Sequence, residues 1–205
     1  MKQMHDLERL IGRINYGNAN PRDLLALRNS LQHLPAIVDF LKFDTKLLAT
    51  IQAMPQLQEV RTKIENAISD EPPITIREGN IIKQGYNAEL DELHSITRNS
   101  KQYLQKLEDA EKEKTGISTL RVKYTRVFGY FIEVTKKNLH LVPENYIRKQ
   151  TTANAERYIT EELKIEEEKI LNAQEKIVEL EYNLFQNIIQ EIAQKTQEIQ
   201  LAASK

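Results

Sequence analysis

The sequence predicts a mainly α-helical protein with one small antiparallel β-sheet inserted between two long helices. Over most of the 205 residues, apolar side chains recur every three or four positions, the spacing of a helix that packs on one face. The exception is TLRVKYTRVFGYFIEVTKK, residues 119–137, where Val, Ile, Tyr, Phe and Thr are concentrated as in β-strands. Residues 160–205 contain no glycine or proline that would interrupt a long helix.

Residues 1–69 predict about five short helices that pack into a compact helical domain. Apolar residues at helical spacing form each buried face, and prolines or capping residues mark the boundaries. The expected boundaries are a C-cap at Gly17, a start at Asn20-Pro21, further starts at Pro35, Asp44 and Pro55, and an end near Ser69. Nothing in these helices indicates a chemical role.

The sequence DEPP at residues 70–73 ends the helical region. Two β-branched runs follow around Glu78-Gly79-Asn80, and this pattern predicts a β-hairpin over residues 74–83. Asn87 is then typical of an N-cap, and an apolar stripe predicts a first long helix that ends at Thr115-Gly116.

The second long helix is expected to begin after Thr160, which can cap it, and to run for about 40 residues or about 60 Å. Its apolar stripe is narrow, so we expect it to pair with the first long helix in an antiparallel coiled coil. A narrow stripe does not suit the centre of a globular core. The strand-forming block would then lie at the tip of a two-helix arm.

The strand-forming block and the residues after it are basic, although the net charge of the whole chain is −1. Residues 119–158 contain eight Lys and Arg against three Glu. Alternation along the first strand places Arg121, Lys123 and Thr125 together on one face. The charges are therefore concentrated on the predicted sheet.

The rest of the block predicts how the sheet is built. Residues 128–134 are apolar at nearly every position and are expected to form a central strand, in which Gly129 indicates a bulge or a close backbone approach. Residues 138–146 predict a turn and a short helical turn that begins at Pro143. Residues 147–159 predict another polar segment that can form a strand.

Neutral hydrogen-bond donors accompany the cations of this block at Thr151, Thr152 and Asn154, and this mixture suits phosphate oxygens. We predict a surface that binds nucleic-acid backbones without reading bases, since no set of bidentate side chains fits a groove. Two alternatives stay open. Lys and Arg on strands also discourage edge pairing. The aromatic residues are more typical of a core than of a base-stacking platform; they are Tyr130, Phe131, Tyr146 and Tyr158.

The sequence gives no support for catalysis, and we do not expect an enzyme. Glycine motifs for phosphate binding are absent, the four histidines stand singly, and Glu166-Glu167-Glu168 is more typical of a solvated helix face than of a cation site. Because there is no cysteine and no apolar run of about 20 residues, we expect a cytoplasmic protein without membrane spans. A helical coiled-coil scaffold that binds a protein partner is the rival reading.

Two long stretches carry a resemblance to known proteins: LRVKYTRVFGYFIEVTKKNLHLVPENYIRKQTTANAERYITEELK at residues 120–164 and DLERLIGRINYGNANPRDLLALRNSL at residues 6–31. The first resembles the clamp region of the MutS family of DNA mismatch repair proteins, and the second resembles the start of that family's helical core. The resemblance implies a core domain in residues 1–86, a first lever helix in 87–118, a β-rich clamp in 119–159 and a second lever helix in 160–205.

The same resemblance implies a part of a longer protein, whose mismatch-reading and ATPase domains lie outside these residues. It implies double-stranded DNA as the partner, a homodimer that works with a MutL-type protein, and no cofactor here, because ATP and Mg²⁺ belong to the ATPase domain. Charge pattern and family together predict these contacts to the DNA backbone: Lys123, Thr125, Arg126, Lys149, Gln150, Thr151 and Asn154. Asn154 matches the family residue, whereas Thr125 stands where many members have Asn and Ala153 where some have Lys.

Overall fold

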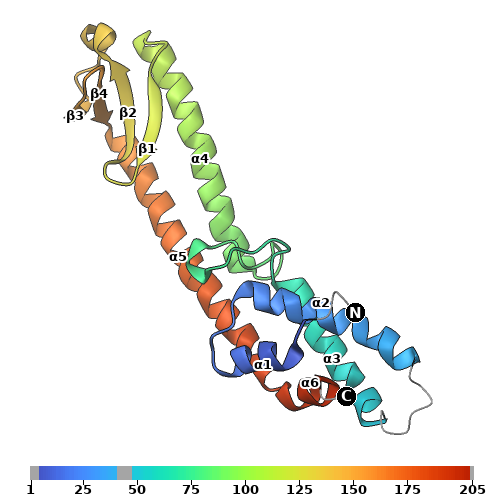
Figure 1. Cartoon of the computed structure of the whole chain (residues 1–205). Helices are drawn as coiled ribbons and strands as arrows, with labels where there is room; N and C mark the ends of the chain where they lie inside the picture. Colours follow the sequence, from blue (N-terminus) through green and yellow to red (C-terminus); the bar gives the residue numbers. More distant parts are fainter. Residues whose placement is uncertain (1–4, 41–47, 204–205) are drawn as a thin grey trace. The chain divides into compact units, whose positions relative to one another are not determined.

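A computed structural model describes residues 5–40 and 48–203, and its helices and strands are shown in Figure 1. The predicted fold class is confirmed, because the chain is mainly helical with one small four-stranded antiparallel sheet. The chain forms two compact units. Unit 1 combines Met1–Leu90 with Ile177–Lys205, and unit 2 is Asp91–Lys176. In the described ranges no helix is both long and apolar enough to cross a membrane.

The elements follow one another in a simple order, with all four strands between the two longest helices. Before the strands come α1 (Leu7–Asn15), α2 (Pro21–Phe40), α3 (Leu48–Ala67), the 3₁₀ turn η2 (Ile76–Glu78) and α4 (Ala88–Thr115). The strand region holds β1 (Arg121–Thr125), β2 (Gly129–Thr135), the 3₁₀ helix η3 (Lys136–Leu141), β3 (Ile147–Thr151) and β4 (Ala155–Ile159). The chain then continues through α5 (Glu161–Ala193) and α6 (Thr196–Ala203).

In residues 5–40 and 48–69, the helices are fewer and longer than predicted. Asn20 does cap α2, because its Oδ1 accepts the Asp23 N–H at 2.9 Å. Pro35 does not open a helix but lies inside α2. Burial of Leu24, Leu27, Leu31 and Leu34 along one face offsets the roughly 3 kcal/mol cost of an internal proline. The predicted start at Pro55 is also wrong, since α3 has already begun at Leu48, and Asp44 lies outside the described residues.

Residues 74–83 do not form the predicted hairpin. Thr75 and Glu78 make a capping box around η2, and within the described residues the only ladder contact of this stretch is an isolated bridge between Ile68 and Ile82. The backbone N–H groups of Ile81 and Ile82 donate instead to the Glu181 carboxylate of α5, at 3.1 and 3.3 Å. A side chain 100 positions further along therefore takes the place of a partner strand.

The second long helix is shorter than predicted and packs differently. Thr160 caps α5 as expected, since its Oγ1 accepts the Leu163 N–H at 3.2 Å, but α5 ends at Ala193 and α6 follows. The expectation that its stripe avoids a globular core is wrong for the second half of α5, because Phe185, Ile188 and Ile192 are at most 1% exposed within unit 1. Only the first half of α5 belongs to unit 2, where α4 and α5 run antiparallel (Figure 1).

The sheet of unit 2 has the strand order β1-β2-β4-β3, and all its pairings are antiparallel. The apolar strand β2 lies in the interior of the sheet, as predicted, while β1 and β3 are the edges. Residues 147–159 form a hairpin of two strands rather than one strand. The short helical turn predicted to begin at Pro143 is found before that proline instead, as η3. One face of the sheet packs against α4 and α5 in a core that includes Leu107, Ile132, Tyr158 and Leu163.

Candidate nucleic-acid interface

The sheet has one face against the helices and one face open to solvent. Leu120, just before β1, and Val122 of β1 join the core, whereas Arg121 and Lys123 are exposed on the other side, so the predicted alternation is confirmed for these residues. The strand pairing places Glu133 of β2 beside Arg121 on one side and Arg157 of β4 on the other. The open face therefore carries charges of both signs.

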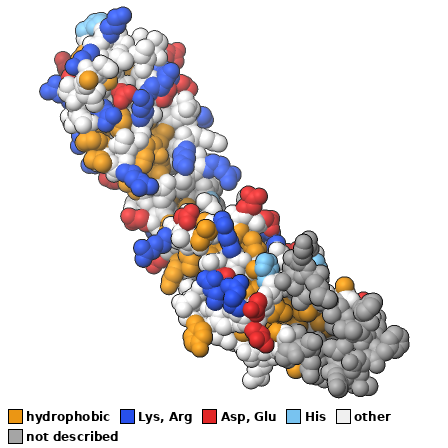
Figure 2. All heavy atoms as spheres, viewed as in Figure 1, with side chains coloured by type: hydrophobic (Ala, Val, Ile, Leu, Met, Phe, Trp, Pro, Cys, Tyr) orange, Lys and Arg blue, Asp and Glu red, His pale blue; other side chains and the backbone are white. Residues whose placement is uncertain are grey.

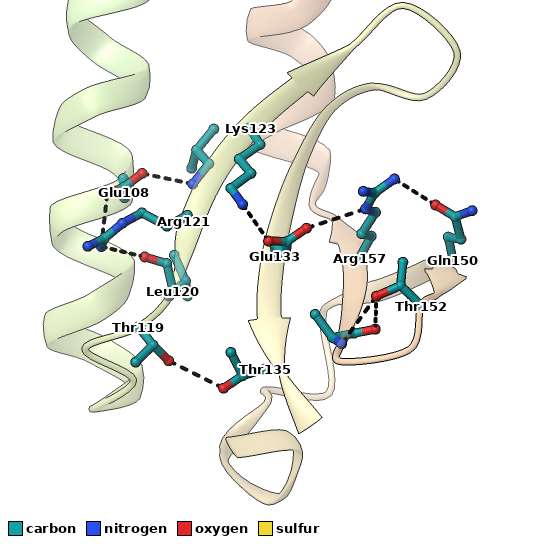
Figure 3. Close-up of polar contacts among 12 residues, drawn as sticks. Glu108, Thr119, Leu120, Arg121, Lys123, Glu133, Thr135, Gln150, Thr152 and Arg157 are labelled. Carbon is teal, nitrogen blue, oxygen red and sulfur yellow. Dashed lines mark hydrogen bonds and ion pairs between the residues drawn. The ribbon is translucent and has the colours of Figure 1, made fainter. Parts of the chain in front are cut away.

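Four side chains form a row across this open face, from one edge strand to the other (Figure 3). Lys123 Nζ donates to Glu133 Oε1 at 2.6 Å, and Arg157 Nε lies 3.5 Å from Glu133 Oε2. Arg157 Nη1 in turn donates to Gln150 Oε1 at 2.8 Å. We call Lys123, Glu133, Arg157 and Gln150 the cross-sheet row. Because a guanidinium can only donate, Gln150 presents its oxygen to Arg157 and keeps its amide N–H groups for other partners.

Aromatic residues support the row but do not form a stacking platform. The guanidinium carbon of Arg157 lies 4.5 Å from the centre of the Phe131 ring and 6.0 Å from that of Phe128. Phe131, Tyr146 and Tyr158 are buried, with exposed fractions of 2, 7 and 6%. Buried rings cannot stack on bases, so the reading of these three residues as core is confirmed, while Tyr130 is partly buried and packs against the same core.

Half of the eight cations in residues 119–158 are held by acidic side chains. Arg121 pairs with Glu108, Lys123 and Arg157 with Glu133, and Arg148 with Glu156. Within the described part of the chain, the other four form no ion pair and are exposed: Arg126, Lys136, Lys137 and Lys149. Figure 2 shows the Lys and Arg side chains of this region, at the upper left, interspersed with acidic ones. We call these four residues the unpaired cations.

The structure does not bring the seven predicted contact residues into one cluster. Lys123 and Lys149 lie on the two opposite edge strands, which are separated by β2 and β4. Thr125 and Arg126 lie at the β1–β2 turn, whereas Asn154 lies at the β3–β4 turn, at the other end of the sheet. That end also carries Lys136, whose N–H donates to the Asn154 carbonyl at 3.1 Å.

Several of the predicted contact groups already have partners inside the protein. Besides Lys123 and Gln150, the Thr125 hydroxyl accepts the Phe128 N–H at 3.3 Å, and the Thr151 hydroxyl donates to Glu156 at 3.4 Å. Lys149 is the extra residue of a bulge in β3, because Arg148 and Gln150 face consecutive residues of β4. A bulge turns its side chain away from the regular ladder. Arg126, Lys149 and Asn154 are therefore the predicted residues with the least engaged side chains.

Sequence reasoning left out two of the exposed cations and the acidic partners of the others. Lys136 and Lys137 add to the positive charge of the block but are not among the contacts that the sequence predicts. Glu133 was counted only as one of three acids, although it holds two cations. The alternation of β2 places it on the open face, so the signal was present but could be used only with the register of three strands known.

Carboxylates of the helices also shape this sheet. Glu108 of α4 accepts the Val122 N–H of edge strand β1 at 2.8 Å. The run Glu166-Glu167-Glu168 is not a solvated face throughout, since Glu166 is 7% exposed and Glu167 accepts the Tyr130 N–H at 2.9 Å. Gly129 makes this approach possible, because a Cβ there would overlap the Glu167 carboxylate. The predicted close approach at Gly129 is confirmed.

Contacts within the sheet shift the pKa values of several groups. The hydrogen bond from Lys123, with Arg157 nearby, lowers the pKa of Glu133 even though partial burial opposes this. The hydrogen bond from Tyr158 and the charge of Arg148 lower the pKa of Glu156. Burial and the hydrogen bond to Glu156 raise the pKa of Tyr158 to about 12. Both carboxylates therefore stay charged near neutral pH.

Acid is expected to destabilise unit 2. A lowered carboxylate pKa stabilises the folded state above the unfolded value, about 4.3, and this contribution is lost as the pH falls through the folded pKa. The melting temperature, measured by circular dichroism, should stay constant from pH 7 to about 5 and fall below about pH 4.3. The melting temperature of the Glu133→Gln/Glu156→Gln variant should fall less steeply with acid. That of Glu168→Gln, a change at an exposed position, should fall as in the parent. An equally steep decline in the double variant would contradict this expectation.

In residues 5–40 and 48–203, no group of three or more His, Asp and Glu side chains is placed to hold a metal ion. The unpaired cations and the neutral donors beside them are suited to anions. Phosphate oxygens on a polymer backbone are the anions that such a dispersed set of donors fits best.

Comparison with known proteins identifies relatives along the whole chain. Residues 85–176 match the family model described as MutS family domain IV. DNA mismatch repair protein MutS of Alkaliphilus oremlandii is 49% identical over 205 residues, which is 99% of this chain and 23% of that protein. The same-named proteins of Methanosarcina barkeri and Listeria innocua are 46 and 52% identical over 100 and 92% of this chain. The chain spans 22 to 23% of the length of these three relatives.

Proposed function

The chain belongs to the MutS family through residues 85–176, and on this basis we propose that its sheet binds the backbone of double-stranded DNA without sequence preference. The observation that carries the proposal is the set of four unpaired cations, one on the small sheet and three in the turn and 3₁₀ helix next to it, with neutral donors beside them. Charges without partners in the free protein can replace the counterions of phosphates at little cost.

The proposed contacts come first from the side chains that are least engaged within the protein. These are Arg126, Lys149 and Asn154, together with Lys136 and Lys137 at the same end of the sheet as Asn154. The amide N–H groups of Gln150 are a further donor, oriented by Arg157. Lys123, Thr125 and Thr151 would need to leave an internal partner before they could contact a phosphate. Among residues 5–40 and 48–203, no helix or ribbon presents bidentate side chains to base edges, so the proposed binding has no sequence preference.

In the whole protein this sheet would serve DNA mismatch repair, the activity named for the relatives. There it would act as the clamp, in residues 119–159, and the parts of α4 and α5 in unit 2 would carry it as lever helices. A homodimer would supply two clamps around one duplex, with a MutL-type protein as a further partner. ATP and Mg²⁺ would bind outside this chain. Each of these roles is an extension of the proposed backbone contact.

Titration of the 205-residue chain with short duplex DNA tests the proposal. Binding should be weak, with a dissociation constant of about 10⁻⁴ M at physiological salt, and should weaken steeply as salt rises. Matched and mismatched duplexes should bind equally, since nothing on the sheet reads bases. Fluorescence anisotropy of labelled matched and mismatched duplexes at several salt concentrations measures the affinities and their dependence on salt. Absence of salt-dependent binding at low salt would refute the proposal.

Charge reversal identifies the contacts. Lys136→Glu/Lys149→Glu removes two unpaired cations, so the slope of log affinity against log salt should fall by about 2 and the affinity at low salt by at least about 10-fold. Lys101→Glu/Lys106→Glu, with the same charge change on the exposed side of α4, is the matched control and should retain most of the affinity. Equal losses in the two variants would show only a general charge effect. Unchanged circular-dichroism melts would exclude unfolding.

A scaffold that binds a protein partner through its helices is the second candidate. It is favoured by exposed apolar residues on α4 and α5 within unit 2, among them Ile96, Tyr103 and Ile165, which line a groove of about 650 Å³. This function predicts damage from charge reversals along residues 166–188 and none from Lys149→Glu. The two functions therefore give opposite results for the same variants.

A further inference from the structure

The cross-sheet row contains a feature that a simple phosphate-binding face would not need, namely the carboxylate of Glu133 at its centre (Figure 3). One oxygen holds the Lys123 ammonium at 2.6 Å, and the other lies 3.5 Å from the Arg157 guanidinium. Only 22% of the Glu133 side chain is exposed, so the carboxylate is partly shielded from water and salt. One acidic residue thus holds two cations on the face that would meet DNA.

Building on the proposed function, we propose that Glu133 limits the affinity of the sheet for DNA by withholding Lys123 and Arg157 from phosphate oxygens. A phosphate that approached either cation would have to replace the carboxylate and would be repelled by it at the same time. The sheet therefore binds DNA with fewer charges than it carries. Fewer charge contacts make the surface easier to release from a backbone.

The two withheld cations differ in how they are held. Half of the Lys123 side chain is exposed, at 52%, so Glu133 alone keeps its ammonium from solvent partners. Arg157 is only 22% exposed and is also fixed by Gln150 and by the Phe131 ring. Removal of the Glu133 charge should consequently release Lys123 fully and Arg157 in part. The gain in charge contacts with DNA should lie between one and two.

Glu133→Gln tests the inference against Glu144→Gln in the 205-residue chain. Both changes remove one negative charge from residues 119–158, but Glu144 is exposed and, within the described residues, has no ion pair to break. Glu133→Gln should tighten duplex binding at least about 5-fold near 0.1 M salt and steepen the salt slope by about 1 to 2, because each phosphate contact adds about 0.9 to that slope. Glu144→Gln should change the affinity less than about 2-fold and leave the slope unchanged. Equal effects of the two variants would overturn the inference.

Lys123→Gln and Lys149→Gln give a second test that leaves Glu133 in place. Both side chains are exposed lysines on edge strands, but only Lys123 is held by a carboxylate. Lys149→Gln should lower the salt slope by about 1, and Lys123→Gln should change it by much less. If both lower it equally, Lys123 already contacts phosphate and the inference fails while the proposed function stands. If the parent chain does not bind duplex DNA at all, the inference and the proposed function are both wrong.

Discussion

Glu181→Ala is expected to lower the free energy of unfolding of unit 1 by about 3 kcal/mol or more, because two buried donors would lose their acceptor. The Glu181 side chain is fully buried at 0% exposure, and its Oε1 accepts the N–H groups of Ile81 and Ile82 at 3.1 and 3.3 Å. Both isoleucines are themselves buried. A buried N–H without an acceptor costs about 1–3 kcal/mol, and alanine leaves a cavity besides.

Chemical denaturation followed by circular dichroism measures this loss, and hydrogen exchange locates it. The amides of Ile81 and Ile82 should exchange faster in Glu181→Ala, whereas the Leu163 amide in unit 2 should keep its protection. Glu181→Gln keeps an acceptor oxygen and should lose less. Glu179→Ala, at an exposed position of the same helix, should stay within about 0.5 kcal/mol of the parent. A loss in Glu181→Ala no larger than in this control would contradict the argument.

The same carboxylate explains why part of unit 1 could not be predicted. Caps such as Asn20, Asn87 and Thr160 were predicted correctly because the donor of each lies three residues further along the chain. The hairpin expected over residues 74–83 failed because the acceptor for its backbone lies 100 positions away, in α5. β-branched residues around a glycine favour a hairpin only when no other acceptor in the fold forms hydrogen bonds with their backbone N–H groups.

The sheet shows the same division between local and distant information. Alternation along β1 placed Lys123 on the exposed face correctly, since the period of a strand is fixed by its backbone. Whether Lys123 is free to contact a phosphate depends on Glu133, ten residues away. For Arg157 it depends on Glu133 and Gln150, which the register of β2, β4 and β3 brings beside it. Composition thus located the basic surface, but only the pairing of the strands separates the cations held by carboxylates from the unpaired ones.

Gly129→Ala is expected to destabilise unit 2 by about 2–3 kcal/mol, from two separate causes. Gly129 has φ +70°, in the left-handed region, where a side chain costs about 1–2 kcal/mol. A Cβ would also overlap the Glu167 carboxylate, which must then move and lose the Tyr130 N–H at 2.9 Å, a bond worth about 1 kcal/mol. The variant would weaken the contact between the start of β2 and α5.

Gly116→Ala separates the two causes, because Gly116 has nearly the same φ, +71°, and no atom within 4 Å of the added Cβ. It should cost only the backbone strain of about 1–2 kcal/mol, measured by the same chemical denaturation. Glu167→Ala should relieve the overlap, so Gly129→Ala/Glu167→Ala should cost about 1 kcal/mol less than the sum of the two single changes. If Gly129→Ala cost no more than Gly116→Ala and the changes were additive, the carboxylate would have no part in holding the turn. Such a result would mean that backbone conformation alone, rather than the approach of Glu167, requires glycine at this position.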